Sequence, residues 1–217
     1  MTHLLVTGCN RGIGRAIVED ALSRGWQVTG TARNSAEVPD VNLIECEMES
    51  VMQLSAAFAA LAPLDILVNN AGEIGPARQS SLDMDFAGFR RMLTTNTLAP
   101  LAVSQACLPA LRQRPGARIL SVSSQMAWMG YRKSDRIAYR ASKAALNKVM
   151  QGLATDLEPE GIAVALVDPG WVRTDMGGAE ADNDPADVAR GLLDLAEKLR
   201  IEDTGRFFRH TGEERTF

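Results

Sequence analysis

The sequence contains few of the residues that bind metals or form disulfides. Its 217 residues include three cysteines, Cys9, Cys46 and Cys107, and two histidines, His3 and His210. An odd, scattered set of cysteines forms no disulfide framework and lacks zinc-ligand spacing, so we expect reduced thiols and no metal site. The histidines lie at the chain ends, remote from every motif, and we expect them to be structural or solvent-exposed. A chain of this length can bury a sizeable core without such cross-links.

Long apolar runs and an excess of positive charge are also missing. The chain has 23 lysines and arginines against 27 acidic residues, a formal net charge of −4, and no basic stripe. This composition argues against a nucleic-acid partner. No run approaches the ~18 apolar residues that a membrane span requires. The first residues include no charged leader followed by an apolar stretch. We therefore expect a cytoplasmic protein that binds no membrane.

A regular alternation of strand and helix patterns is present instead. Apolar runs predict strands over 3–7, 26–32, 41–46, 64–69, 118–123, 162–168 and 205–209. Helical spacing predicts a first helix between Gly12 and Gly25, then helices over 51–61, 83–94, 96–113, 137–157 and 185–200. Almost continuously apolar strands are typical of a parallel sheet covered on both faces. The sequence therefore predicts one α/β domain over 1–217, with a single doubly wound Rossmann-type parallel sheet and helices on both faces.

A glycine-rich loop, TGCNRGIG, occupies residues 7–14, between the first predicted strand and the first helix. A doubly wound fold binds a dinucleotide there, with its pyrophosphate at the helix N-terminus. Gly8 would permit the turn, Gly12 would let a phosphate approach the backbone, and Gly14 would let helix and strand pack closely. The spacing differs from G-x-G-x-x-G, and three glycines alone are equally typical of a plain tight turn. Their position favours the dinucleotide site.

The end of the second strand indicates which dinucleotide binds. An acidic residue at this point would hold the ribose 2′-hydroxyl of NAD, but the chain has Thr31, Ala32 and Arg33. A guanidinium can grip the 2′-phosphate of NADP, which a carboxylate would repel. Arg11, inside the glycine loop, could add a second positive charge. The alternative is two solvated surface arginines, and we favour NADP(H).

A tyrosine and a lysine stand four residues apart on the helix predicted over 137–157. This spacing places Tyr139 and Lys143 on one helix face. The pair alone is common and is equally compatible with a surface location. However, Ser123 and Ser124 close the preceding strand at its C-terminal end, where ligands bind in this kind of fold.

Together these motifs resemble the short-chain dehydrogenase/reductase family along the whole chain. The features that carry the resemblance are TGCNRGIG, Asn69-Asn70-Ala71-Gly72, Asn96 in TTNTLAP, Ser124 closing SVSS, Tyr139 with Lys143, and Pro169-Gly170 continuing as WVRTDM. Within the family, DPGWVRTDMGG and the closing GRFFRHTGEERTF are similar to the short C-factor and sniffer-like carbonyl reductases.

The resemblance implies four catalytic residues. Tyr139 would be the general acid that protonates a carbonyl oxygen, and the base in the reverse direction. Lys143, together with the oxidised nicotinamide, would lower the tyrosine pKa and hold the nicotinamide ribose. Ser124 would hydrogen-bond the substrate oxygen, and Asn96 would hold a water that links Lys143 to solvent. Two more residues than usual separate Ser124 from Tyr139, which leaves Ser123 as the substitute.

The resemblance also implies a cofactor site for NADP(H). Asn69, Ala71 and Gly72 would pass close to the adenosine ribose, while the Val172 backbone and the Thr174 hydroxyl would orient the carboxamide. Glu47 stands where the family usually has Asp or Asn beside the adenine. The complete expected set is Gly8, Asn10, Arg11, Gly12, Ile13, Gly14, Arg33, Glu47, Met48, Asn69, Ala71, Gly72, Tyr139, Lys143, Pro169, Gly170, Val172 and Thr174.

Two functions are compatible with these features. The first is an NADP(H)-dependent oxidoreductase acting on a small-molecule carbonyl or alcohol substrate. The second is a dinucleotide-binding sensor or signalling protein of the C-factor type. A complete set of catalytic residues favours the first function, because a sensor needs no acid catalyst. The resemblance further implies a homo-oligomer, a dimer or tetramer, formed through the helices predicted over 96–113 and 137–157.

Large apolar side chains flank the expected active site. They would suit a hydrophobic or aromatic carbonyl compound, because apolar walls are typical of small-molecule pockets. The same side chains are equally compatible with the protein core or a subunit contact. They are Trp128, Met129, Tyr131, Trp171 and Met176.

Overall fold

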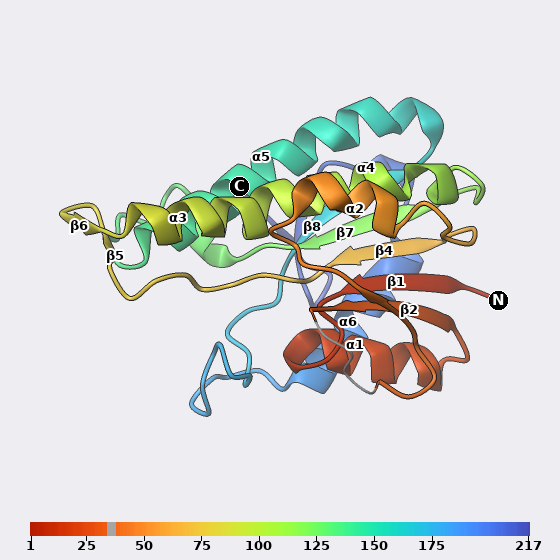
Figure 1. Cartoon of the computed structure of the whole chain (residues 1–217), viewed down its shortest axis with the longest axis horizontal. Coiled ribbons are helices and arrows are strands. Elements are labelled where there is room, and N and C mark those ends of the chain that lie inside the picture. Colours follow the sequence, from red (N-terminus) through yellow and green to blue (C-terminus); the bar gives the residue numbers. More distant parts are fainter. Residues whose placement is uncertain (34–37) are drawn as a thin grey trace.

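A computed structural model describes residues 1–33 and 38–217, and an eight-stranded sheet runs through the middle of the molecule (Figure 1). The strand order is β10-β9-β8-β7-β4-β1-β2-β3. Neighbouring strands are parallel except β9 and β10, which are antiparallel. The strands are β1 (His3–Thr7), β2 (Gln27–Ala32), β3 (Asn42–Glu45), β4 (Ile66–Asn69), β7 (Arg118–Val122), β8 (Ala163–Asp168), β9 (Phe207–Arg209) and β10 (Glu214–Arg215).

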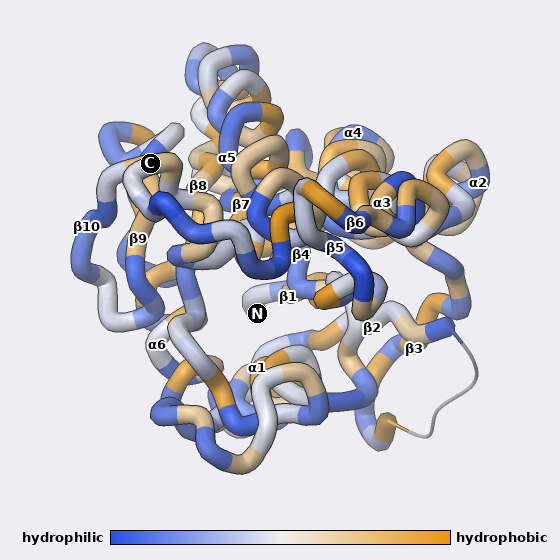
Figure 2. Tube along the Cα trace, turned by 90° about the vertical axis from the view of Figure 1, so that its left-hand side faces the viewer, coloured by the Kyte–Doolittle hydropathy of each residue, from blue (hydrophilic) through white to orange (hydrophobic). Residues whose placement is uncertain are grey.

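Helices cover both faces of the sheet, as the end-on view in Figure 2 shows. On one face lie α1 (Gly12–Ser23) and α6 (Pro185–Lys198). On the other lie α2 (Val51–Ala57), α4 (Ala99–Leu111) and α5 (Ile137–Leu157). Helix α3 (Phe86–Leu93) continues the line of α4 beyond the sheet (Figure 1). This arrangement confirms the predicted doubly wound α/β fold.

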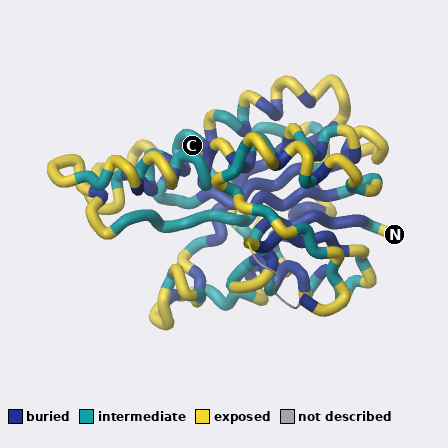
Figure 3. Tube along the Cα trace, viewed as in Figure 1, coloured by how far each residue is buried: buried dark blue, intermediate teal, exposed yellow. Residues whose placement is uncertain are grey.

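The core has one cluster on each face of the sheet. Along β1, Leu4 and Val6 join the cluster under α1 and α6, whereas Leu5 joins the cluster under α2, α4 and α5. Successive strand side chains point to opposite faces, so a strand covered on both faces must be apolar throughout. The central strands are accordingly buried along their length (Figure 3). The apolar runs of the sequence are the direct result.

The winding direction of the sheet changes between β1 and β4. From β1 the chain proceeds outward through β2 to β3, whereas β4, β7 and β8 follow one another on the other side. The loops after β1 and β4 therefore leave the carboxyl edge in different directions. Ligands of doubly wound folds bind in the crevice at this switch point.

Some elements differ from those expected from the sequence. A short hairpin, β5 (Gln79–Ser80) and β6 (Asp83–Met84), precedes α3, and β10 follows β9. Strands of two residues show no periodicity, so neither hairpin was predicted. The expected gap between the helices at 83–94 and 96–113 is a π-helical turn, η1 (Thr94–Leu98), in which Ala99 N–H bonds to Thr94 O. The helix expected over 51–61 ends at Ala57.

Short 3₁₀ turns follow β7, α5 and α6. They are η2 (Gln125–Ala127), η3 (Glu158–Glu160) and η4 (Ile201–Asp203). Within the described residues, no helix combines the length and the apolar character needed to cross a bilayer. The same residues contain no cluster of three or more His, Cys, Asp or Glu side chains placed to hold a metal ion.

Candidate active site

The glycine loop forms a cradle between β1 and α1. Gly8 and Gly12 have positive φ angles of 69° and 54°, which non-glycine residues rarely adopt. A Cβ on Gly14 would overlap the carbonyl oxygen of Gly8. Among described side chains none caps α1, whose N-cap is Arg11, and its first turn carries no acid. The free N–H groups and the positive end of the helix dipole therefore suit an anionic pyrophosphate.

The loop after β4 is fastened to this cradle. The hydroxyl oxygen of Thr7 accepts hydrogen bonds of 3.0 Å from the backbone N–H groups of Asn70 and Ala71. The Asn70 side chain donates to the carbonyl oxygens of Thr7 and Gly8. Asn69 turns its side-chain amide into the protein, toward Ser104 and Ser121. The buried Asn69 side chain is therefore turned away from the cradle.

Tyr139 and Lys143 lie on the buried face of α5, with residue exposures of 8% and 5%. The Lys143 ammonium is 5.9 Å from the centroid of the Tyr139 ring and donates a 2.8 Å hydrogen bond to the Val122 carbonyl. The Ser124 hydroxyl lies close enough to the phenol of Tyr139 to lower its pKa, and it accepts a 3.1 Å hydrogen bond from Met126 N–H. Ser123 instead donates to the Asn147 side chain over 2.5 Å. Ser124, rather than its substitute Ser123, therefore faces the tyrosine.

Burial determines the acidity of both ionisable groups. Loss of water raises the pKa of Tyr139 to about 12. The Ser124 hydroxyl and the Arg136 cation oppose this rise in the tyrosine pKa, and the Asp168 carboxylate adds to it. Burial lowers the pKa of Lys143 to about 8. The expected effect of Lys143 on the tyrosine pKa involves the oxidised nicotinamide as well, and it stays a prediction.

The π-helical turn places Asn96 beneath this site. Asn96 is fully buried; its Oδ1 accepts from Glu73 N–H over 2.9 Å, and its Nδ2 donates to Glu73 O and to Ser142 Oγ. Asn96 thereby ties the loop after β4 to α5. Both amide hydrogens are used, so a water held by Asn96 would donate to one of its oxygens, and this role stays a prediction. A Cβ on Gly72 would lie 3.1 Å from Asn96 Oδ1 and 3.6 Å from Lys143 Nζ, which places these three residues together.

The segment after β8 closes over the glycine loop. Gly170 turns the chain with a φ of 73°, and Val172 is buried against the core under α1 and α6. The methyl carbon of Thr174 lies 3.2 Å from the position that a Cβ on Gly12 would take. Pro169 begins this segment, so the expected carboxamide-binding residues lie beside the expected phosphate cradle.

The outer residues of the expected cofactor site are spread over the neighbouring loops. Arg33 is exposed directly after β2, next to residues 34–37, which lie outside the described residues. Arg11 is exposed and pairs with Asp175 over 3.4 Å. Of the remaining members, Asn10 is exposed, Ile13 packs against the core, and Glu47 and Met48 follow β3.

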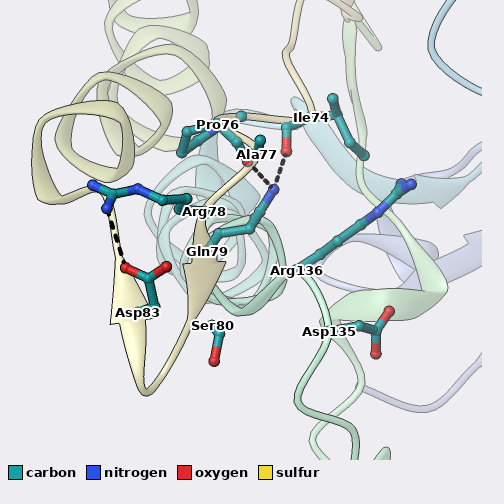
Figure 4. A pocket seen from close by; sticks show the side chains of 10 residues that line it. Ile74, Pro76, Ala77, Arg78, Gln79, Ser80, Asp83, Asp135 and Arg136 are labelled. Carbon is teal, nitrogen blue, oxygen red and sulfur yellow. Dashed lines mark hydrogen bonds and ion pairs between the residues drawn. The ribbon is translucent and has the colours of Figure 1, made fainter.

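A cavity of about 520 Å³ lies between the chain after β4 and the start of α5 (Figure 4), and its lining does not include Ser124, Tyr139 or Lys143. Gln79 forms part of its wall. The Gln79 Oε1 accepts from Tyr139 N–H over 3.1 Å, and its Nε2 donates to the carbonyls of Ile74 and Pro76. Gln79 thus helps to hold the first turn of α5. Sequence reasoning missed this contact, since the two residues are 60 positions apart and no motif links them.

Two expectations about side chains near the site were tested by their burial. The aromatic and methionine residues that flank the site are exposed, so their interpretation as core residues is wrong; they are Trp128, Met129, Tyr131, Trp171 and Met176. His3 is structural, bonded to Pro63 O and Thr29 Oγ1. His210 is not remote from the motifs, because its backbone N–H donates to Asp168 O directly before Pro169-Gly170.

Comparisons with known proteins place this geometry in a family. The short chain dehydrogenase family profile matches residues 2–185. C-signal of Myxococcus xanthus is 42% identical over 164 residues, which cover 75% of this chain and 98% of that protein. Carbonyl reductase Sniffer of D. melanogaster is 27% identical with a TM-score of 0.92, and each chain is fully covered.

A second solved structure agrees with the first. The NADPH-bound carbonyl reductase from chicken fatty liver is 27% identical with a TM-score of 0.90, covering 100% of this chain and 99% of that one. The matched region includes the glycine loop, the Ser124, Tyr139 and Lys143 cluster and the segment after β8. The chain therefore belongs to the short-chain dehydrogenase/reductase family and is an NAD(P)-dependent oxidoreductase by membership.

Proposed function

We propose that the protein transfers a hydride between NADP(H) and a carbonyl or alcohol substrate, with Tyr139 as general acid and base. The observation that carries this proposal is the cluster of Tyr139, Ser124 and Lys143 at the carboxyl edge of the sheet, beside the glycine cradle. A bound nicotinamide would supply or accept the hydride. The residues of the chain would position the reactants and move the proton.

The protonation states favour carbonyl reduction at neutral pH. With a pKa of about 12, Tyr139 carries its proton and can donate it to the substrate oxygen. Ser124 hydrogen-bonds the same oxygen and steadies the charge that develops on it. Lys143, with a pKa of about 8, is mostly a cation at neutral pH and stabilises the phenolate left after proton transfer. Oxidation of an alcohol would need that phenolate at the start and therefore a higher pH.

Two arginines support NADP(H) over NAD(H). Arg33 directly follows β2, and Arg11 lies in the glycine loop. The sequence has no acidic residue at the end of β2, where it would bind a ribose hydroxyl and repel a 2′-phosphate. The NADPH bound to the chicken carbonyl reductase is consistent with this preference.

A signalling protein that binds a dinucleotide is the second candidate. The observation that favours it is the similarity to C-signal of Myxococcus xanthus, at 42% identity. Such a protein would need the glycine cradle but not the acid catalyst. The hydroxyl of Tyr139 therefore distinguishes the two functions.

The test removes that hydroxyl alone. Tyr139→Phe should lower carbonyl reduction by at least about 10²-fold, the usual contribution of a general acid, while the Kd for NADPH stays within about threefold. The chain has two tyrosines, so Tyr131→Phe is the matched control, and it should keep near wild-type turnover. Full activity in Tyr139→Phe would refute the mechanism. An equal loss of activity in Tyr139→Phe and Tyr131→Phe would show that the loss is not specific to the hydroxyl of Tyr139.

A further inference from the structure

A buried carboxylate joins four segments behind the active site. Asp168, the last residue of β8, is 2% exposed. Its Oδ1 accepts hydrogen bonds from Gln125 N–H over 3.0 Å and from Gly170 N–H over 3.1 Å. Its Oδ2 pairs with the guanidinium of Arg215 over 2.5 Å. Gln125 follows Ser124 directly, so one side chain fixes both the serine loop and the turn at Gly170.

The C-terminal hairpin carries the positive partner. Arg215 lies on β10 opposite Phe207 of β9, and its side chain is 16% exposed. The guanidinium lies 6.0 Å from the centre of the Phe207 ring, which also stacks with Phe217. These contacts hold the hairpin against the sheet. Arg215 lies beyond residue 185, where the match to the family profile ends.

We propose that Arg215 is a positioning residue: it neutralises the buried Asp168 carboxylate and thereby holds Gln125, which follows Ser124, and Gly170, in the turn after β8, in place. The C-terminal hairpin is then part of the active-site framework. This inference rests on the proposed function for its catalytic meaning. A buried carboxylate that loses its partner is strongly unfavourable, so the position of both loops depends on the arginine.

The pair also determines the charge near Tyr139. The charged groups that face the tyrosine are Asp168 from β8, Arg136 from the start of α5 and Lys143 from the next turn of α5. Among these, Asp168 disfavours the phenolate and raises the tyrosine pKa. Arg215 is the cation paired with that carboxylate. Removal of the arginine and removal of the carboxylate should therefore move the tyrosine pKa in opposite directions.

The test compares Arg215→Met, Asp168→Asn and the double variant with the wild type. The readout is the pKa of Tyr139, followed by NMR of ζ-carbon-labelled tyrosine with NADP⁺ bound, in a Tyr131→Phe background that leaves one tyrosine. Arg215→Met should raise this pKa by about 0.5 to 1 unit, and Asp168→Asn should lower it by a similar amount. The double variant should return close to wild type. The side-chain amide introduced by Asp168→Asn keeps an oxygen that can accept from the N–H groups of Gln125 and Gly170. A change in the tyrosine pKa in this variant therefore does not result from the loss of these hydrogen bonds.

Turnover supplies the second readout. The kcat for carbonyl reduction should fall at least about tenfold in Arg215→Met, and the double variant should recover much of it. The control is Arg206→Met, which breaks the exposed pair with Glu214 on the same hairpin and should change neither quantity. An unchanged tyrosine pKa in both single variants would overturn the proposal. Equal effects of Arg206→Met and Arg215→Met on the tyrosine pKa and on kcat would also overturn it, because both variants would then act only by destabilising the hairpin.

The two failures can be told apart. If the wild type reduced no carbonyl compound, the proposed function would fail, yet the order of the tyrosine pKa values would still measure the Asp168–Arg215 pair. If carbonyl reduction depended on Tyr139 but the pKa values did not follow that order, only the role of Arg215 would be refuted.

Discussion

The central residues of the site, Tyr139 and Lys143, are both pushed toward their neutral forms by burial. The pKa of the tyrosine rises to about 12 and that of the lysine falls to about 8. A neutral tyrosine is ready to donate a proton, which agrees with carbonyl reduction. A buried lysine that titrates close to neutral pH makes the free energy of unfolding depend on pH, as well as the activity.

Replacing Lys143 with methionine should remove this pH dependence of stability in the protein without dinucleotide. The unfolded chain binds the lysine proton up to about pH 10.5, whereas the folded protein releases it above about pH 8. The free energy of unfolding of the wild type therefore increases as the pH rises from 8 to 10.5, because the folded protein no longer has to bury a charged lysine. At pH 7, the free energy of unfolding of Lys143→Met should exceed that of the wild type by up to about 3 kcal/mol.

Chemical denaturation of both proteins at several pH values measures this difference. The advantage of Lys143→Met should shrink steadily between pH 8 and 10.5. A difference that stays constant over that window would show that the lysine pKa is not lowered. Lys148→Met, on an exposed position of the same helix, is the control and should show no such trend.

Arg33 should decide coenzyme preference. Arg33→Ala should raise the KM for NADPH about ten- to a hundredfold, since charge-assisted hydrogen bonds contribute about 1.5 to 3 kcal/mol. The KM for NADH should stay nearly constant, because NADH lacks the 2′-phosphate. Arg112→Ala, at the end of α4, gives the same charge change away from the site and should alter neither value. Equal losses with both coenzymes would contradict a phosphate-binding role.

Among the elements, the glycine loop and the π-helical turn bring the site together. The loop is held by the Thr7 hydroxyl, and the turn directs Asn96 toward the loop after β4. π-helical turns occur often at functional sites. The glycine loop was recognisable in the sequence because its position between strand and helix is characteristic. The π-turn was not, since a helix with one extra residue in a turn keeps much of its apolar pattern.

Gly14→Ala tests the close approach within the loop. The added Cβ would overlap the carbonyl oxygen of Gly8, so the loop must shift. We expect a loss of about 1 to 3 kcal/mol in stability and a similar or larger loss in NADPH binding, as for other overpacked sites. Thermal unfolding and dinucleotide titration measure the two effects.

The matched control is Gly152→Ala on α5. Apart from its chain neighbours and the backbone of its own helix, no atom lies within 4 Å of the Cβ it would add, and the residue is exposed. This variant should gain about 0.5 to 1 kcal/mol, the usual advantage of alanine over glycine in a helix. Equal behaviour of the two variants would contradict the overlap described at Gly14.

For the whole molecule, the parallel sheet explains how motifs scattered over the chain form one site. The glycine loop, Asn70, Ser124 and Gly170 all follow the carboxyl ends of strands, which meet at one edge. This convergence was predictable, because it follows from strand order alone. The ion pair of Asp168 and Arg215 was not, because it joins residues 47 positions apart through a strand of two residues. Long-range polar contacts leave no periodic pattern in a sequence.

The central claim, hydride transfer between NADP(H) and a carbonyl compound, is tested most directly by following the hydride itself. The purified protein would be incubated with NADPH deuterated at the transferable position and a panel of aldehydes, ketones and quinones, with NADH in parallel. The account predicts deuterium on the carbinol carbon of an alcohol product, formed faster from NADPH than from NADH and absent with Tyr139→Phe. Tight NADPH binding without transfer of deuterium to any member of the panel would contradict it and favour the signalling function.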